Sequence, residues 1–133
     1  MALTATQLAT LRIDILADPV LAAFPNNGDG AFAIAEAYNL LAVPDFIVWK
    51  TSVPTSECKK VMNWTEYIGR TAPERDAWVF MLSNGVIDPS QVNVRQGIQD
   101  IFSGAGGAIT RPALVALAKR SARRAEKLFA TGT

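Results

Sequence analysis

The C-terminal stretch, residues 110–133, constrains the fold more than any other part of the chain. It can begin with Thr110 as a helix cap and Pro112 in the first turn, where a missing N–H costs nothing. Apolar residues then recur at helical spacing, and neither Gly nor Pro interrupts the run from Ala113 until Gly132. The pattern predicts one helix over residues 111–129, about 28 Å long at a rise of about 1.5 Å per residue.

The two faces of this predicted helix differ in chemistry. One face is apolar, whereas the other carries cations relieved only by Glu126. From Arg111 onward there are six Lys or Arg and one Glu, a balance of +5; the rest of the chain holds seven against eleven acidic residues, a balance of −4, and the two sum to +1. A chain with charges separated in this way can associate head to tail with its own copies or place its basic end on an acidic partner. On charge alone, a solvated basic helix face is the alternative interpretation.

We therefore predict that the end of this helix binds a partner. The predicted partner-binding residues are Arg111, Lys119, Arg120, Arg123, Arg124, Lys127, Leu128 and Phe129.

The remainder of the chain shows the start signals of several short helices. Thr4 or Thr6 can cap a helix that runs to about Ala17. Asp18 can cap a second, short helix with Pro19 at its first position. Thr71 stands three residues before a glutamate, which is the spacing of a capping box. In the first of these helices the apolar residues fall on one side: Leu8, Leu11, Ile15 and Leu16.

Three stretches between the helices have other signatures. Residues 26–30, NNGDG, are typical of a loop, and residues 104–107, GAGG, of a flexible link to the terminal helix. Residues 45–53 are the most β-like part of the chain. No second convincing strand is visible in the sequence, so we expect this stretch to be an extended connector packed on the helices. A neighbouring subunit could add a strand there.

Together these signals predict an all-α fold, a compact bundle of about five or six short helices with a long basic C-terminal helix and one extended connector. At 133 residues the size favours a single domain. We expect a body at residues 1–107 and a docking helix with its tail at residues 108–133. Hydrophobic residues make up 50% of the chain and charged residues only 19%, which favours a surface that is partly covered by partners.

The composition argues against enzymatic chemistry. The chain has no histidine, which removes the usual general base and most zinc sites. Its one cysteine, Cys58, excludes an internal disulfide and fits a reducing cytoplasm. We therefore expect no enzyme activity and no catalytic, metal or cofactor site. We also expect no membrane association, because the N-terminus does not read as a signal peptide and no apolar run reaches membrane-spanning length.

Binding to nucleic acid is the rival to protein docking. The cations of the C-terminal stretch could contact phosphates, with an affinity that falls steeply as salt rises. The chain as a whole is near neutral, however, and no helix-turn-helix pair precedes the basic segment. A cytosolic DNA-binding protein therefore remains an alternative.

Several stretches resemble a small family of tailed-bacteriophage proteins encoded among the virion structural genes. The matching stretches are LTATQLATLR (3–12), PNNGDGAFAIAEAYN (25–39), PDFIVWKTSV (44–53), NVRQGI (93–98) and RRAEKLFATGT (123–133). They contain no catalytic motif, and residues 54–92 lie outside the resemblance.

The role that best fits a short helical chain of this resemblance is a head-to-tail adaptor in the virion neck, assembled in the cytoplasm of the host bacterium. The resemblance implies a homo-oligomer, about twelve copies in a ring. It also implies contacts with the phage portal protein and with a tail or nozzle protein, and non-specific contact with genomic DNA in the channel. A capsid-decorating or tail-associated virion protein is the alternative within the particle.

Deletion of residues 108–133 is predicted to abolish portal binding, because it removes all the predicted partner-binding residues. Some helical content should survive in the body, as measured by circular dichroism. Normal assembly of the truncated chain on portals would contradict the assignment.

Overall fold

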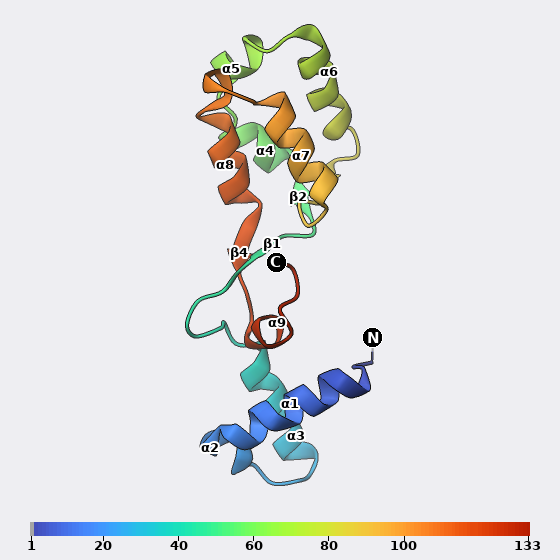
Figure 1. Cartoon of the computed structure of the whole chain (residues 1–133), viewed down its shortest axis with the longest axis vertical. Coiled ribbons are helices and arrows are strands. Elements are labelled where there is room, and N and C mark those ends of the chain that lie inside the picture. Colours follow the sequence, from blue (N-terminus) through green and yellow to red (C-terminus); the bar gives the residue numbers. More distant parts are fainter. Residues whose placement is uncertain (1) are drawn as a thin grey trace. The chain divides into compact units, whose positions relative to one another are not determined.

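The structure, a computed structural model, describes residues 2–133 and forms two compact units (Figure 1). Unit 1 comprises the residues up to Phe46 together with Ser121–Thr131, and unit 2 comprises Ile47–Arg120 and Gly132–Thr133. The expected single domain with a division at residue 107 stays a prediction, and neither unit ends there.

The described residues of unit 1 form four helices: α1 (Ala5–Ala17), α2 (Pro19–Ala22), α3 (Gly28–Asn39) and α9 (Arg124–Phe129). The predicted caps are confirmed for the first two. The Thr4 hydroxyl accepts from the N–H of Gln7 at 3.2 Å, and the Asp18 carboxylate accepts from the N–H of Val20 at 2.9 Å. Helix α3 begins within the expected loop, because the Asn27 side chain accepts from the N–H of Gly30 at 2.9 Å. Gly30 lies against the carbonyl of Pro25, where a Cβ would clash.

Unit 2 holds the remaining elements. Its helices are α4 (Thr55–Val61), α5 (Trp64–Ile68), α6 (Ala72–Met81), α7 (Val92–Ile101) and α8 (Thr110–Leu117), with a 3₁₀ turn η1 (Ala105–Gly107). Its strands are β1 (Ile47–Trp49), β2 (Val53–Pro54), β3 (Val86–Ile87) and β4 (Lys119–Ser121), the last of which ends at the first residue of unit 1. Thr71 caps α6 as expected, accepting from the N–H of Glu74 at 3.3 Å.

The main hydrophobic core lies in unit 2. Trp78 of α6 and Phe102 at the end of α7 are buried edge to face, with ring centroids 5.1 Å apart. Cys58, Ile98 and Leu114 complete the centre of this cluster. The core therefore draws on α4, α6, α7 and α8, and it includes none of the residues of unit 1.

Two small sheets correct the prediction of an all-α fold. Helices make up 59% of the structure and strands 9%, so the fold is mostly helical. Strand β1 pairs with β4, and β2 pairs antiparallel with β3 through Val53 and Ile87. The β-like stretch at residues 45–53 therefore does find strand partners within the chain, one of them inside the segment that was expected to be helix.

The prediction of one helix over residues 111–129 is wrong. Backbone groups of residues 46–50 form hydrogen bonds with the groups that a continuous helix would have paired internally. Helix α8 ends at Leu117, and the carbonyl of Ala118 accepts from the N–H of Lys50 at 2.8 Å. The N–H of Ala122, which a continuous helix would donate to Ala118, is bonded to the carbonyl of Phe46 at 2.6 Å. The segment is therefore extended at Lys119–Ser121 and helical again only at α9.

This division changes what a deletion of residues 108–133 would do. Leu114 and Ala118 are buried, and both belong to unit 2. The same deletion removes α9, and with it Ala122, from unit 1. It would therefore remove core residues as well as the predicted contact residues, so point substitutions give a cleaner test of docking.

Helix α8 is capped from another element of unit 2. The Glu66 carboxylate of α5 accepts from the N–H of Ile109 at 3.0 Å and from the N–H of Thr110 at 2.6 Å. Partial burial acts to raise the pKa of Glu66, but these hydrogen bonds outweigh it and hold the pKa below its ordinary value of 4.5. A carboxylate of this kind stabilises the fold above pH 4.5 and ceases to do so as the pH falls through its lower folded pKa.

Glu66→Gln should therefore destabilise unit 2 at pH 7, because glutamine keeps the shape but loses the charge at the start of α8. The difference from the unsubstituted chain should shrink as the pH falls below 4.5. Urea unfolding followed by tryptophan fluorescence measures this, since Trp49, Trp64 and Trp78 all belong to unit 2. Glu57→Gln, which alters a surface carboxylate that forms an ion pair with Lys60, is the control. A difference independent of pH would contradict the role of the charge.

Candidate docking site

The predicted partner-binding residues are divided between the two units rather than aligned on one helix. Arg111, Lys119 and Arg120 belong to unit 2, while Arg123, Arg124, Lys127, Leu128 and Phe129 belong to unit 1. One helical face was expected to carry five of these cations, and this is wrong, since α8 ends at Leu117 and α9 begins at Arg124. The five are Lys119, Arg120, Arg123, Arg124 and Lys127. That they bind a partner stays a prediction.

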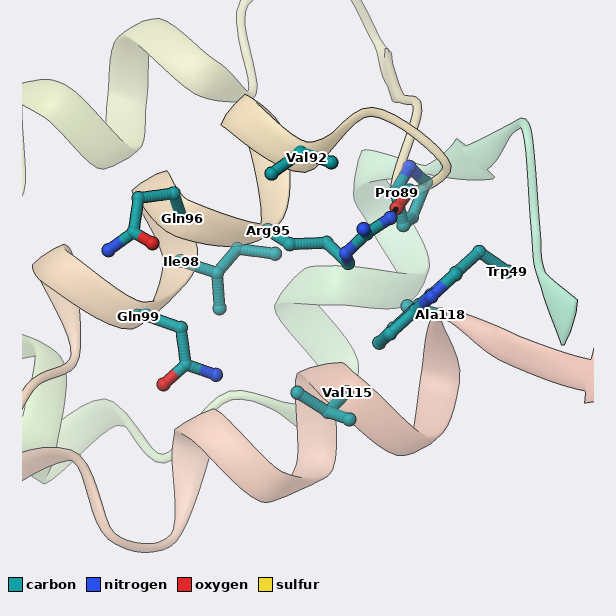
Figure 2. A pocket seen from close by; sticks show the side chains of 9 residues that line it. All are labelled: Trp49, Pro89, Val92, Arg95, Gln96, Ile98, Gln99, Val115 and Ala118. Atoms are coloured by element: carbon teal, nitrogen blue, oxygen red, sulfur yellow. Dashed lines mark hydrogen bonds between the residues drawn. The ribbon is translucent and has the colours of Figure 1, made fainter. Parts of the chain in front are cut away.

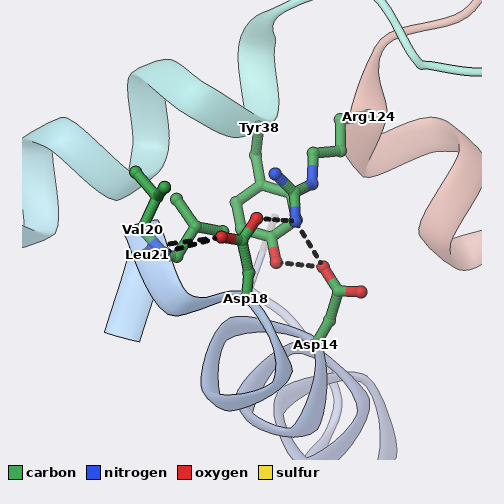
Figure 3. A network of polar contacts seen from close by, with 6 residues as sticks. All are labelled: Asp14, Asp18, Val20, Leu21, Tyr38 and Arg124. Atoms are coloured by element: carbon green, nitrogen blue, oxygen red, sulfur yellow. Dashed lines mark hydrogen bonds and ion pairs between the residues drawn. The ribbon is translucent and has the colours of Figure 1, made fainter. Parts of the chain in front are cut away.

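Arg124 is the centre of a polar network inside unit 1 (Figure 3). Its Nη2 donates to Oδ2 of Asp14 at 3.2 Å and to Oδ2 of Asp18 at 3.1 Å. The guanidinium carbon lies 4.7 Å from the centroid of the Tyr38 ring, and the Tyr38 hydroxyl donates to the same oxygen of Asp14. One arginine of α9 thus connects α1, α3 and the residue that caps α2.

The pKa shifts in this network show that Arg124 stays charged within unit 1. The N–H of Val20 lowers the pKa of Asp18, partial burial opposes this, and Arg124 lowers the pKa further. Burial raises the pKa of Tyr38 to about 12, reinforced by its hydrogen bond to Asp14. For Arg124, burial acts to lower the pKa, but the two carboxylates overcome it and raise the pKa. Arg124 is therefore a permanently charged structural residue whose charge is used within unit 1.

Two other predicted contact cations also have internal partners. Nζ of Lys127 donates to the carbonyl of Pro44 at 2.9 Å. Nη1 of Arg111 donates to the carbonyls of Phe102 at 2.6 Å and Gly104 at 3.3 Å, and so holds the turn before η1. Leu128 and Phe129 are half-buried. These residues are less available to a partner than the sequence suggested.

The exposed cations of the predicted set are Lys119, Arg120 and Arg123. Lys119 lies in β4 with its Nζ 4.8 Å from the centroid of the Trp49 ring. Sequence reasoning missed a further residue at the same ring, Arg95 of α7, whose guanidinium carbon is 4.6 Å from the centroid. Two cations therefore share one indole, which comes from β1.

Figure 2 shows the pocket beside this indole, with Trp49 and Arg95 pointing toward each other. The pocket has a volume of about 280 Å³, and Val92, Ile98 and Val115 give it apolar walls. Arg95 is fixed by its donation to the carbonyls of Pro89 at 2.8 Å and Ser90 at 3.0 Å. Within residues 2–133, neither Arg95 nor Lys119 forms an ion pair with a carboxylate. The pocket thus presents positive charge next to an aromatic and apolar surface, which suits an acidic protein segment.

Other features of the described residues add no chemistry to this site. The thiol of Cys58 is buried in the core of unit 2, and burial raises its pKa, so it serves packing. The described residues contain no cluster of acidic residues, cysteine or histidine suited to holding a metal ion. In the described part of the chain, no helix has the length and apolar character needed to cross a bilayer.

Comparison with known proteins adds no further constraint. The chain matches no family model, no curated protein and no solved structure.

Substitution of Arg124 should loosen unit 1, while substitution of its neighbour Arg123 should not. Arg124→Gln leaves Asp14 and Asp18 close together without their cation, and it removes the contact with Tyr38. Hydrogen exchange of the α1 amides should become several-fold faster in this variant. Arg123→Gln, at an exposed position, is the matched control and should exchange like the unsubstituted chain. Equal exchange in both variants would show that the network does not hold α1 in place.

Proposed function

We propose that this chain is a structural virion component, a head-to-tail adaptor that forms a ring joining the portal to the tail of a tailed phage. The observation that carries the proposal is the apolar surface of unit 1. Helix α1 has no buried residue, even though it is rich in apolar side chains. Its Leu8, Ile13 and Leu16 are 53%, 71% and 63% exposed. A helix with apolar residues on all sides is typical of a covered position, so unit 1 suits an assembly better than a free monomer.

The resemblance to tailed-phage proteins supports a position in the virion neck for this assembly. Adaptors of that kind are small helical subunits seated beneath the portal, where they meet the next tail component. The exposed cations of β4 and the Trp49 pocket supply a surface for the portal. Arg95 and Lys119, which lack carboxylate partners in the described chain, complement an acidic groove.

The alternatives differ in copy number and in ligand. A capsid-decorating protein should be present in many more copies per particle than a ring adaptor, which should be present in about twelve. A cytosolic DNA-binding protein should be absent from particles and should bind short duplexes with a steep dependence on salt. Quantitative mass spectrometry of purified virions separates these possibilities.

Charge reversal in β4 should weaken portal binding. Lys119→Glu/Arg120→Glu replaces the two exposed cations of β4, of which Lys119 lies over the Trp49 ring. We expect the affinity for the portal protein encoded in the same genome to fall at least about tenfold. Binding of purified chain to purified portal, measured by interferometry, gives the affinity.

Lys59→Glu/Lys60→Glu is the matched control, because it reverses two adjacent exposed lysines on α4. This control should bind the portal like the unsubstituted chain. Equal loss in both variants would point to a general charge effect, and no loss in the β4 variant would exclude this strand as the docking surface.

A further inference from the structure

Two exposed helix faces of unit 1 carry the same spacing of apolar and charged residues with opposite charges. On α1, Leu8, Arg12 and Leu16 follow one another at intervals of four residues. On α3 and its C-terminal cap, Phe32, Glu36 and Leu40 do the same. We call these the Arg12 row and the Glu36 row. Each is an apolar–charged–apolar row about 12 Å long at the helical rise.

Both rows face away from the interior of unit 1. Asp14 of α1 and Tyr38 of α3 point inward to the Arg124 network (Figure 3). Arg12 precedes Asp14 by two residues, and Glu36 precedes Tyr38 by two, which is a rotation of about 200° around the helix.

The exposure of the apolar members agrees with this geometry. Leu8 and Leu16 are 53% and 63% exposed, and Phe32 and Leu40 are 66% and 67% exposed. Such side chains gain the most from being covered by a neighbour.

The charges at the centres of the rows have no partner in the described chain. Within residues 2–133, neither Arg12 nor Glu36 makes an ion pair or a side-chain hydrogen bond. Beside Glu36, the surface forms a hollow lined also by Phe24, Ala37 and Leu40. A side chain from a row of matching spacing can enter this hollow, as in packing of helices along their i, i+4 ridges.

We propose that the Arg12 row of one copy of this chain packs on the Glu36 row of a second copy. The pairing sets Arg12 opposite Glu36 and covers the apolar members on both sides of that ion pair. Two Arg12 rows, or two Glu36 rows, would not pack together, because the pairing would place like charges against each other. The contact is therefore heterologous, with each copy giving one row and accepting the other.

A heterologous contact of this kind generates a ring when its rotation closes. The proposal deepens the adaptor function and rests on it for the closure of the ring. The contact itself is a property of the isolated chain and is tested without portal or particle.

The test is self-association of purified full-length chain by sedimentation velocity, for the unsubstituted chain and for Arg12→Glu and Glu36→Arg. The unsubstituted chain should form oligomers as its concentration rises toward the order of 1 mM, a weak but specific range. Each single substitution should weaken association at least about tenfold, because it sets like charges at the centre of the contact.

The decisive measurement uses a mixture of the Arg12→Glu and Glu36→Arg variants. In an equimolar mixture of the two variants, the glutamate introduced on α1 of one variant would meet the arginine introduced on α3 of the other. The next contact would join the unaltered Arg12 and Glu36, so association should return. Lys59→Glu and Asp76→Arg reverse exposed charges in unit 2 and should leave association unchanged. Return of association on mixing also shows that both variants are folded.

Three outcomes would overturn the proposal: an unsubstituted chain that stays monomeric, single variants that associate as tightly as the unsubstituted chain, or a mixture that fails to associate. None of these outcomes tests the adaptor function, which depends on the copy number measured in purified virions. A chain that self-associates as proposed but is absent from virions would keep the contact and remove the adaptor function.

Discussion

Backbone pairing between residues 42–50 and the C-terminal segment is the constraint on which the rest of the structure depends. In unit 1, the N–H of Ala42 donates to the carbonyl of Ala122 at 2.9 Å, and the N–H of Ala122 donates to Phe46. In unit 2, the N–H of Lys50 donates to Ala118 and the N–H of Trp49 donates to Gly132. These bonds satisfy the β-like stretch that lacked an evident partner, and they do so at the expense of a continuous final helix. As a result, the basic segment contributes to both units.

The same constraint redistributes the charge that the sequence concentrates at the C-terminus. A straight helix would have shown its cations along one face, whereas α9 turns Arg124 onto Asp14 and Asp18. What reads in sequence as a basic surface is thus partly an internal ion network. The exposed cation beside an aromatic ring lies instead in β4, at Lys119. Arg95 adds a second cation from a helix that the sequence did not connect with the C-terminus.

Local signals in the sequence predicted the starts of three helices but not that of α8, where Thr110 is the first helical residue and Ile109 is the N-cap. Thr4, Asp18 and Thr71 cap the helices assigned to them, because a cap depends on residues only two or three positions away. The end of α8 at Leu117 was not predictable in this way, since the residue that replaces its next helical bond is Lys50, far back in the chain. The Trp49 pocket was missed for the same reason.

The inner face of α1 was also predicted wrongly. The sequence placed four apolar residues on one side, but the structure half-buries Leu11 and Ile15 and exposes Leu8 and Leu16. A helix with apolar residues on all sides gives no periodicity from which to choose its inner face.

The two units differ in stability because the main hydrophobic core lies in unit 2. Unit 2 has its own hydrophobic cluster, so changes to exposed residues around Trp49 leave its fold supported by Trp78 and Phe102. Unit 1 has few buried side chains and relies on polar ties such as the Arg124 network, which leaves its apolar helix faces to be covered from outside. A surface for a different protein is therefore best placed on unit 2, which is stable without it, and contacts between copies on unit 1, which gains most from them. On this argument the stability of unit 1 should depend on concentration, because each copy supplies apolar cover that its neighbour lacks.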